Sequence, residues 1–185
     1  MENSIAEHAE ELSPDQISGP SWNNSSEYPS LTSNEYLYDL KQLESLHGRI
    51  SALVDACAPI MTSISAPRPD ADLNIDISIL IPSLQAITEM EETSRKILRS
   101  MRTFAYCLNC IDGSLPEPQS ALSKLESLSG KLEATTKPVH VFLTLAPEDL
   151  LKSYLNHAHT KPFEFQIRER RKFVDTLLSE KEEAL

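Results

Sequence analysis

Glycine is scarce in this sequence: only 4 of its 185 residues are glycine, and only 6% are aromatic. Tight turns and close backbone approaches to a ligand usually need glycine, so this scarcity argues against sheet-rich or loop-rich enzyme folds. The 3 cysteines are an odd number, which does not make a disulfide framework. We therefore expect free thiols in a reducing compartment.

Positive charge and long apolar runs are also scarce. The chain has 17 Lys and Arg against 28 Asp and Glu, a net charge of -11, whereas phosphate neutralisation needs a basic face. No stretch approaches the roughly eighteen apolar residues of a membrane span, and the acidic start MENSIAEHAEEL lacks the apolar segment of a signal peptide. These features predict an intracellular protein, nuclear or cytoplasmic, that makes no direct contact with nucleic acid and has no membrane span.

Residues 1–32 carry six acidic residues and no Lys or Arg. A segment of this composition buries too little apolar surface to offset its chain entropy, so we predict a disordered acidic tail. Its large aromatics, Trp22 and Tyr28, either remain solvated or form a short motif that docks on a partner. A further hypothesis is that the tail folds back on a basic stripe of the same chain and modulates partner access.

Two stretches carry apolar residues at alternating spacings of three and four, from Leu43 to Ile64 and from Ile87 to Ile111. This pattern is typical of helices that pack along their length, so we predict an antiparallel helical hairpin over residues 33–112 with a linker at about 65–77. Thr32 opens a capping-box spacing, and Pro59 predicts a kink or a break in the first helix. The residues expected to form the packing or partner seam are Leu46, Ile50, Leu53, Ile97, Met101, Phe104 and Leu108.

Residues 113–185 predict about three shorter helices that pack on the hairpin or on partners. The first is expected over about 118–135 and ends at Lys137-Pro138, because proline lacks an amide donor. A buried connector over 139–145 leads to a short helix after Pro147, and a last helix follows Pro162. The predicted fold is therefore an all-α, irregular hairpin or coiled coil extended into a bundle, with a disordered acidic N-terminal tail.

Cys107 and Cys110 form a CxxC pair, which raises the question of a metal or redox site. A zinc site needs four ligands, and the nearest supplement, His157 and His159, lies on a different predicted helix end. A redox CxxC usually stands at a helix N-terminus, whereas this pair is predicted in the last turns of a helix. We therefore expect buried or half-buried cysteines, no metal and no cofactor, and the absence of catalytic motifs predicts that the protein is not an enzyme.

Charged residues form stripes on the predicted helices. Glu91 and Glu92 precede Arg95 and Lys96 by four residues, the spacing of exposed ion pairs. Basic residues follow similar spacings, and each basic group is either a solvated face or a contact for an acidic partner. The basic residues concerned are Arg95, Arg99, Arg102, Arg168, Arg170 and Arg171.

Together these features predict a non-catalytic helical interaction or scaffold subunit of a multi-protein intracellular complex. The alternative is a self-contained helical bundle that binds a peptide or an apolar ligand in a groove. A third hypothesis, based on charge alone, is a regulator whose acidic tail meets basic proteins such as histones. The seam pattern is the same whether helices pack within the chain or between chains, so it leaves homo- and hetero-oligomers both open.

Overall fold

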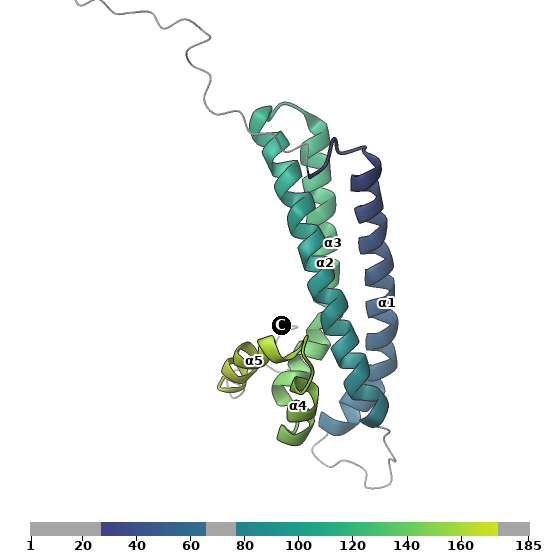
Figure 1. The fold of residues 1–185 in the computed structure, drawn as a ribbon, viewed down its shortest axis with the longest axis vertical. Coiled ribbons are helices and arrows are strands. Elements are labelled where there is room, and N and C mark those ends of the chain that lie inside the picture. Colours follow the sequence, from purple (N-terminus) through teal and green to yellow (C-terminus); the bar gives the residue numbers. More distant parts are fainter. Residues whose placement is uncertain (1–26, 66–76, 174–185) are drawn as a thin grey trace, which may run out of the picture.

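The structure, a computed structural model, describes residues 27–65 and 77–173. Three long helices lie side by side in an elongated antiparallel bundle, and a smaller helical group packs at the end where the third helix finishes (Figure 1). The elements are α1 (Asn34–Ser65), α2 (Ile77–Ile111), α3 (Pro116–Leu145), α4 (Glu148–Leu155), the 3-10 turn η2 (Lys161–Phe163) and α5 (Glu164–Arg171). The prediction of an all-α bundle is confirmed. None of the described helices is long and apolar enough to cross a membrane.

The cap of the first helix lies one residue later than predicted. The hydroxyl of Ser33, not Thr32, accepts a hydrogen bond from the Tyr36 amide at 3.3 Å, and the Ser33 carbonyl accepts the Leu37 amide at 3.0 Å. An N-cap hydroxyl satisfies one of the amides that the first helical turn leaves without a partner. Pro59 lies inside α1 without ending it, and its exposed position leaves the freed carbonyl one turn earlier accessible to water.

The prediction that Lys137-Pro138 ends the third helix is wrong, because α3 continues through Pro138 to Leu145. Pro138 faces solvent, whereas Val139, Phe142 and Leu143 beyond it are buried. An internal proline costs a helix about 3 kcal/mol, but burying each of these large side chains contributes about 1.5–3 kcal/mol. The tertiary contacts therefore outweigh the local penalty, and the third helix is comparable in length with its two neighbours rather than shorter.

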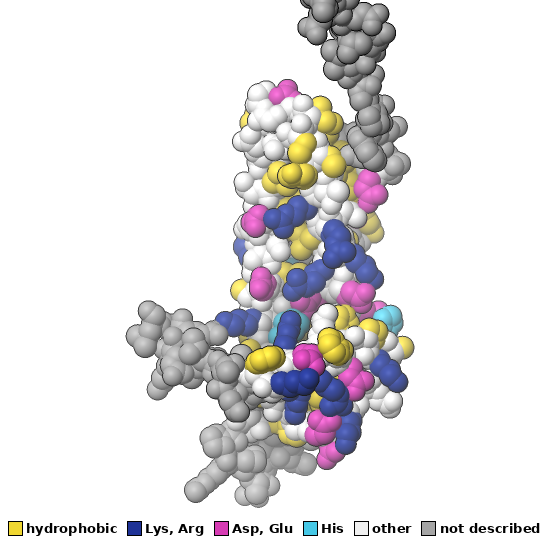
Figure 2. Space-filling view, turned by 90° about the vertical axis from the view of Figure 1, so that its left-hand side faces the viewer, with side chains coloured by type: hydrophobic (Ala, Val, Ile, Leu, Met, Phe, Trp, Pro, Cys, Tyr) yellow, Lys and Arg dark blue, Asp and Glu magenta, His cyan; other side chains and the backbone are white. Residues whose placement is uncertain are grey.

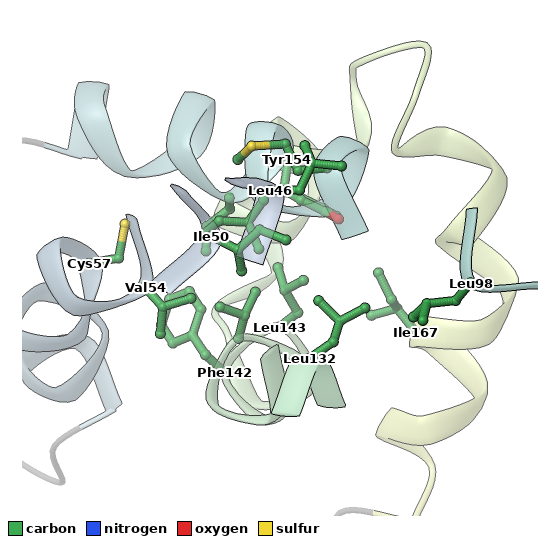
Figure 3. Close-up of a cluster of buried hydrophobic side chains, with 14 of the residues drawn as sticks. Leu46, Ile50, Val54, Cys57, Leu98, Leu132, Phe142, Leu143, Tyr154 and Ile167 are labelled. Carbon is green, nitrogen blue, oxygen red and sulfur yellow. The ribbon is translucent and has the colours of Figure 1, made fainter. Parts of the chain in front are cut away.

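The hydrophobic core runs between the three long helices. Figure 3 shows core residues that come from α1 and α3, among them Leu46, Ile50, Val54, Leu132, Phe142 and Leu143. On α1 the buried positions shift from the heptad seam to Val54 and Met61, because a straight helix of 3.6 residues per turn drifts away from a seven-residue repeat. Ile111, the last residue of the predicted second seam, is 77% exposed.

Candidate functional site

The predicted packing seam lies inside this single chain. Leu46, Ile50, Met101 and Phe104 are buried, and Leu53, Ile97 and Leu108 are partly buried against the same core. The three long helices therefore satisfy one another's apolar faces without a second molecule. A surface for a partner has to be sought among the apolar residues that the bundle leaves exposed.

An apolar groove opens between the N-terminal halves of α1 and α3, with a volume of about 390 Å³. We call it the α1–α3 groove; its lining residues are Leu31, Tyr36, Leu37, Leu40, Pro116, Glu117, Ser120, Ala121, Lys124 and Leu125. Tyr36 and Leu125 are buried and form its floor, whereas Leu37 is 42% exposed. Sequence reasoning missed this groove, although Leu37 and Leu40 precede the predicted seam at helical spacing.

Residue size explains why the groove stays open. On the α3 side the small side chains of Ser120 and Ala121 do not fill the space that Leu37 and Leu40 border from α1. Charged side chains stand at the rim: Lys124 Nζ lies 3.8 Å from Glu44 Oε1, and both of these side chains are more than half exposed. The groove therefore combines an apolar floor with a polar rim, as protein interfaces commonly do.

Tyr28 belongs to the core and not to a docking motif. Its ring packs edge-on against Tyr36 and Phe104, with centroid distances of 5.3 and 5.4 Å, and its hydroxyl donates a hydrogen bond to Asp39 Oδ2 at 2.6 Å. Burial first, and then the bonded Asp39 carboxylate, raise the pKa of Tyr28 above its usual value. The predicted tail of residues 1–32 therefore ends earlier than expected, while Trp22 and the rest of residues 1–26 lie outside the described residues.

A buried carboxylate, Glu91, is the centre of a polar cluster between α2 and α3. Arg95 donates from Nη2 and Nε to Glu91 Oε1 at 2.7 and 3.0 Å, and His140 Nε2 lies 3.0 Å from Oε2. The hydroxyl of Thr136 adds a longer contact of 3.4 Å to Oε1. With three donors on a residue that is only 6% exposed, the cluster ties the two helices together from inside.

The environment of Glu91 corrects its predicted place on an exposed face. Burial would raise the pKa of Glu91, but the hydrogen bonds and charges of His140 and then Arg95 outweigh burial and lower the pKa below its usual value. The signal was present in the sequence, because Glu91 falls on the three-and-four spacing of Ile87, Ser94 and Leu98, which are all buried. The Glu91 carboxylate is therefore held in its ionised form by donors from both helices.

The short helix α4 is fixed to α2 by Tyr154, which is 1% exposed. Its hydroxyl lies 2.8 Å from Thr88 Oγ1, and its backbone carbonyl accepts Gln85 Nε2 at 3.0 Å. The same carbonyl accepts the hydroxyl of buried Thr160 at 2.6 Å, which fixes the segment after α4. These bonds satisfy the end of α4 internally and position α5 against α3.

Most of the predicted basic contact residues are engaged within the chain. Arg95 pairs with Glu91, Arg102 with Glu126, and Arg168 with both Glu148 and Glu164. Arg171 Nη1 donates to the carbonyls of Leu143 and Ala146 at the end of α3, at 3.3 and 2.8 Å. Among the described residues, only Arg99 and Arg170 of the predicted set form no ion pair.

The charge pattern of the surface agrees with this pairing. One face of the molecule carries Lys and Arg side chains over its middle and lower parts, and Asp and Glu side chains lie between them (Figure 2). A mixed face of this kind presents no continuous positive field to an acidic partner. Within the described residues, most of these basic side chains have an acidic partner of the same chain.

The cysteine and histidine pairs do not meet. Cys57 is buried, Cys107 is half-buried and Cys110 is exposed. His159 lies 4.0 Å from Glu89, and Cys107 is 18 residues further along α2, which is about 27 Å at 1.5 Å per residue. In the part of the chain that the structure describes, no group of three or more His, Cys, Asp or Glu is placed to hold a metal ion.

No family model, curated protein or solved structure matches this chain. Its function is therefore inferred from its own surfaces and clusters. Of these, the α1–α3 groove is an apolar hollow that the contacts of the described residues leave unfilled.

Proposed function

We propose that this protein is a non-catalytic helical interaction subunit of a multi-protein intracellular complex, and that the α1–α3 groove is its docking surface. The observation that supports this proposal is the groove itself, an apolar hollow lined by Leu31, Leu37 and Leu40 on a bundle whose seams are already filled. Near it, Ile111 is 77% and Leu115 is 44% exposed at the turn that leads into α3. Exposed apolar side chains around a groove mark interaction sites on many proteins.

The shape of the groove suits a helix. The α3 residues that line it recur at intervals of one and three, so they form a stripe along the helix axis rather than a round pocket. An amphipathic helix that lays its apolar face into such a stripe is a recurrent mode of protein recognition. The polar groups Glu91, Tyr154 and Arg171 are engaged in contacts that hold the bundle together. Their structural use leaves the groove as the better candidate for a functional surface.

A second candidate is the binding of an apolar small molecule or a short peptide in the same groove. Its volume of about 390 Å³ falls within the range of about 300–1,000 Å³ that ligand pockets commonly have. A fluorescent fatty acid displaced by unlabelled competitor, and lost on replacing Leu40 with Lys, would favour this candidate.

The proposal is tested with a photo-crosslinking amino acid placed in the groove at Ser120. The matched control places the same amino acid at Thr103, which is exposed on α2 and does not line the groove. We expect irradiation of native host cells to give a discrete protein adduct from position 120 and none from position 103. Equal adducts at both positions, or no protein adduct at position 120, would contradict a docking role for the groove.

A further inference from the structure

We propose that the α1–α3 groove binds a second copy of this chain, with the two α3 helices packed antiparallel around a two-fold axis. This inference rests on the proposed function, because it names the partner of the same docking surface. In a two-fold interface each residue i of one copy meets residue j of the other, and residue j meets residue i. A surface that fits its own copy must therefore carry a pattern that reads the same in both directions.

The α3 side of the groove carries such a pattern. Its lining residues are arranged symmetrically around the point between Ser120 and Ala121. Turning α3 end over end at this point places Pro116 opposite Leu125, Glu117 opposite Lys124, and Ser120 opposite Ala121. Small residues thus meet at the crossing and an acid meets a base on each side, while Pro116 lies over the buried Leu125 at the groove floor.

Glu117 and Lys124 favour an antiparallel over a parallel packing of the two α3 helices. Glu117 and Lys124 are seven residues apart, which places them on the same face of α3 at about 10.5 Å along the axis. The two-fold relation makes two pairs at once, Glu117 to the other copy's Lys124 and the reverse. A parallel arrangement would instead place Glu117 against Glu117 and Lys124 against Lys124, which is repulsive.

Both charged residues are available for this contact. Among the described residues Glu117 forms no ion pair, and Lys124 lies 3.8 Å from Glu44 in a loose pair whose side chains are 54% and 56% exposed. A pair this exposed contributes little to stability, so Lys124 can turn toward a second carboxylate at little cost. In the assembled dimer Lys124 would lie between Glu44 of its own chain and Glu117 of the other copy.

Residue size and area set the strength of the contact. Ser120 and Ala121 let the two α3 backbones approach closely, while Leu37 and Leu40 of α1 flank the crossing. The groove is short, so the dimer belongs among the smaller interfaces, and we expect a dissociation constant of the order of tens of micromolar. Self-association is therefore expected to depend on concentration and, through the charged rim, on salt.

The test is sedimentation equilibrium of the full chain and of the charge-reversed variants Glu117→Lys and Lys124→Glu. Each single variant places like charges opposite each other twice, and we expect it to weaken the dimer by about tenfold. Mixing the two single variants restores both attractive pairs, so the mixture is expected to dimerise better than either variant alone. The double variant Glu117→Lys/Lys124→Glu restores both pairs as well and is expected to associate within about threefold of the wild type.

Two controls keep the test specific. Glu133→Lys makes the same charge change at an exposed position of α3 that does not line the groove, and it is expected to leave association unchanged. Helix content and melting by circular dichroism are expected to be the same in all variants, because both rim residues are exposed. A dimer that is equally strong in every variant would place self-association on another surface and overturn the inference.

The failure of this inference can be told apart from the failure of the proposed function. A wild-type chain that stays monomeric to several hundred micromolar, while position 120 crosslinks to a different protein, overturns self-association and leaves the docking role intact. A position 120 that crosslinks only to a second copy of the chain supports both proposals. No adduct at position 120, together with a monomeric chain, overturns both.

Discussion

The two ends of the bundle are completed in opposite ways. At the end where α3 leads into α4 and α5, which we call the closed end, Tyr154 and Thr160 are buried and Arg171 bonds to the last carbonyls of α3. At the end where α2 turns into α3, the open end, Ile111 and Leu115 are exposed beside the α1–α3 groove. Both ends expose apolar side chains, Leu145 and Phe165 at the closed end included, but the polar contacts that hold the short helices α4 and α5 on the described bundle lie at the closed end.

This difference separates stability from binding. Hydrogen bonds to buried carbonyls are costly to leave unmade, so the elements at the closed end are held in one arrangement. At the open end, exposed apolar side chains leave no hydrogen bond unmade when they meet a second surface, and their removal from water favours association. We therefore expect substitutions at the closed end to lower the free energy of unfolding, and substitutions at the open end to alter association instead.

The largest effect is expected from Tyr154→Ala at the closed end. This change removes a fully buried ring and its contact with Thr88, and we expect it to lower the free energy of unfolding by about 3–5 kcal/mol. Urea denaturation measures the loss, and Tyr154→Phe, which removes only the hydroxyl, is expected to cost about 1 kcal/mol. A loss below about 1 kcal/mol for Tyr154→Ala would show that the closed end contributes little to stability.

The second effect is expected from Glu91→Gln in the buried cluster. The amide keeps the shape of the side chain but loses the charge that Arg95 and His140 face, so we expect a loss of about 1–3 kcal/mol. The matched control is Glu92→Gln, because the Glu92–Lys96 pair is more exposed and is expected to contribute less than about 0.5 kcal/mol. Equal losses of unfolding free energy for the two variants would show that Glu91 contributes no more than an exposed residue.

The third effect is the partial loss of the stabilisation by Glu91 at acidic pH. The pKa of Glu91 is lowered in the folded state, because His140 and Arg95 outweigh burial, so its ionised form stabilises the fold. This contribution is complete above the unfolded-state pKa of about 4.3 and is lost as the pH falls through the lower folded-state pKa. The stability difference between wild type and Glu91→Gln is therefore expected to shrink as the pH falls below about 4. A stability difference between wild type and Glu91→Gln that grows as the pH falls would show that the folded-state pKa of Glu91 is raised and not lowered.

A smaller effect is expected from Arg171→Ala. The variant loses the hydrogen bonds to the carbonyls of Leu143 and Ala146, which we expect to cost about 1 kcal/mol and to loosen α5. Hydrogen exchange followed by mass spectrometry should show faster exchange in α5 and unchanged exchange in α1. Arg170→Ala serves as the control, since Arg170 is exposed and forms no ion pair among the described residues. Protection of α5 that survives Arg171→Ala would assign its docking to the remaining contacts, among them those of Ile167 and Arg168.

The smallest effect on stability is expected from Leu37→Ser at the open end. Leu37 is 42% exposed, so its replacement should change the free energy of unfolding by about 0.5 kcal/mol or less. Self-association, measured by sedimentation, is expected to weaken by several-fold because Leu37 borders the groove. A destabilisation as large as that of Tyr154→Ala would erase the distinction between the two ends.

The sequence predicted the elements whose signals are local. The predicted hairpin over 33–112, with its linker at about 65–77, places the second helix after that linker, and the helix spans Ile77–Ile111. After the helix ends, Asp112 Oδ1 accepts a hydrogen bond from the Ser114 amide at 2.9 Å. Repeated apolar spacing over many turns averages out single errors, so the identity of such a helix is secure even when the detail of its end is not.

The features that sequence reasoning missed depend on contacts between distant segments. The extension of α3 past Pro138 follows from the burial of Val139 and Phe142, which no local rule reports. Glu91 reads as a surface acid until His140, 49 positions later, is brought beside it. The groove likewise arises where α1 and α3 meet, because the small side chains of α3 matter only once Leu37 stands near them.

Because Cys57 is buried, the rate at which a thiol reagent modifies it measures how often the helix bundle opens. Burial raises the pKa of the Cys57 thiol, and a hydrogen bond with Ser83 only partly opposes this, so the thiol is unreactive in the closed bundle. A reagent can modify Cys57 only when α1 separates from α2. Cys110 is exposed and reacts without any such separation. The ratio of the two labelling rates therefore reports how often the helices part, in the intact chain and without an added probe.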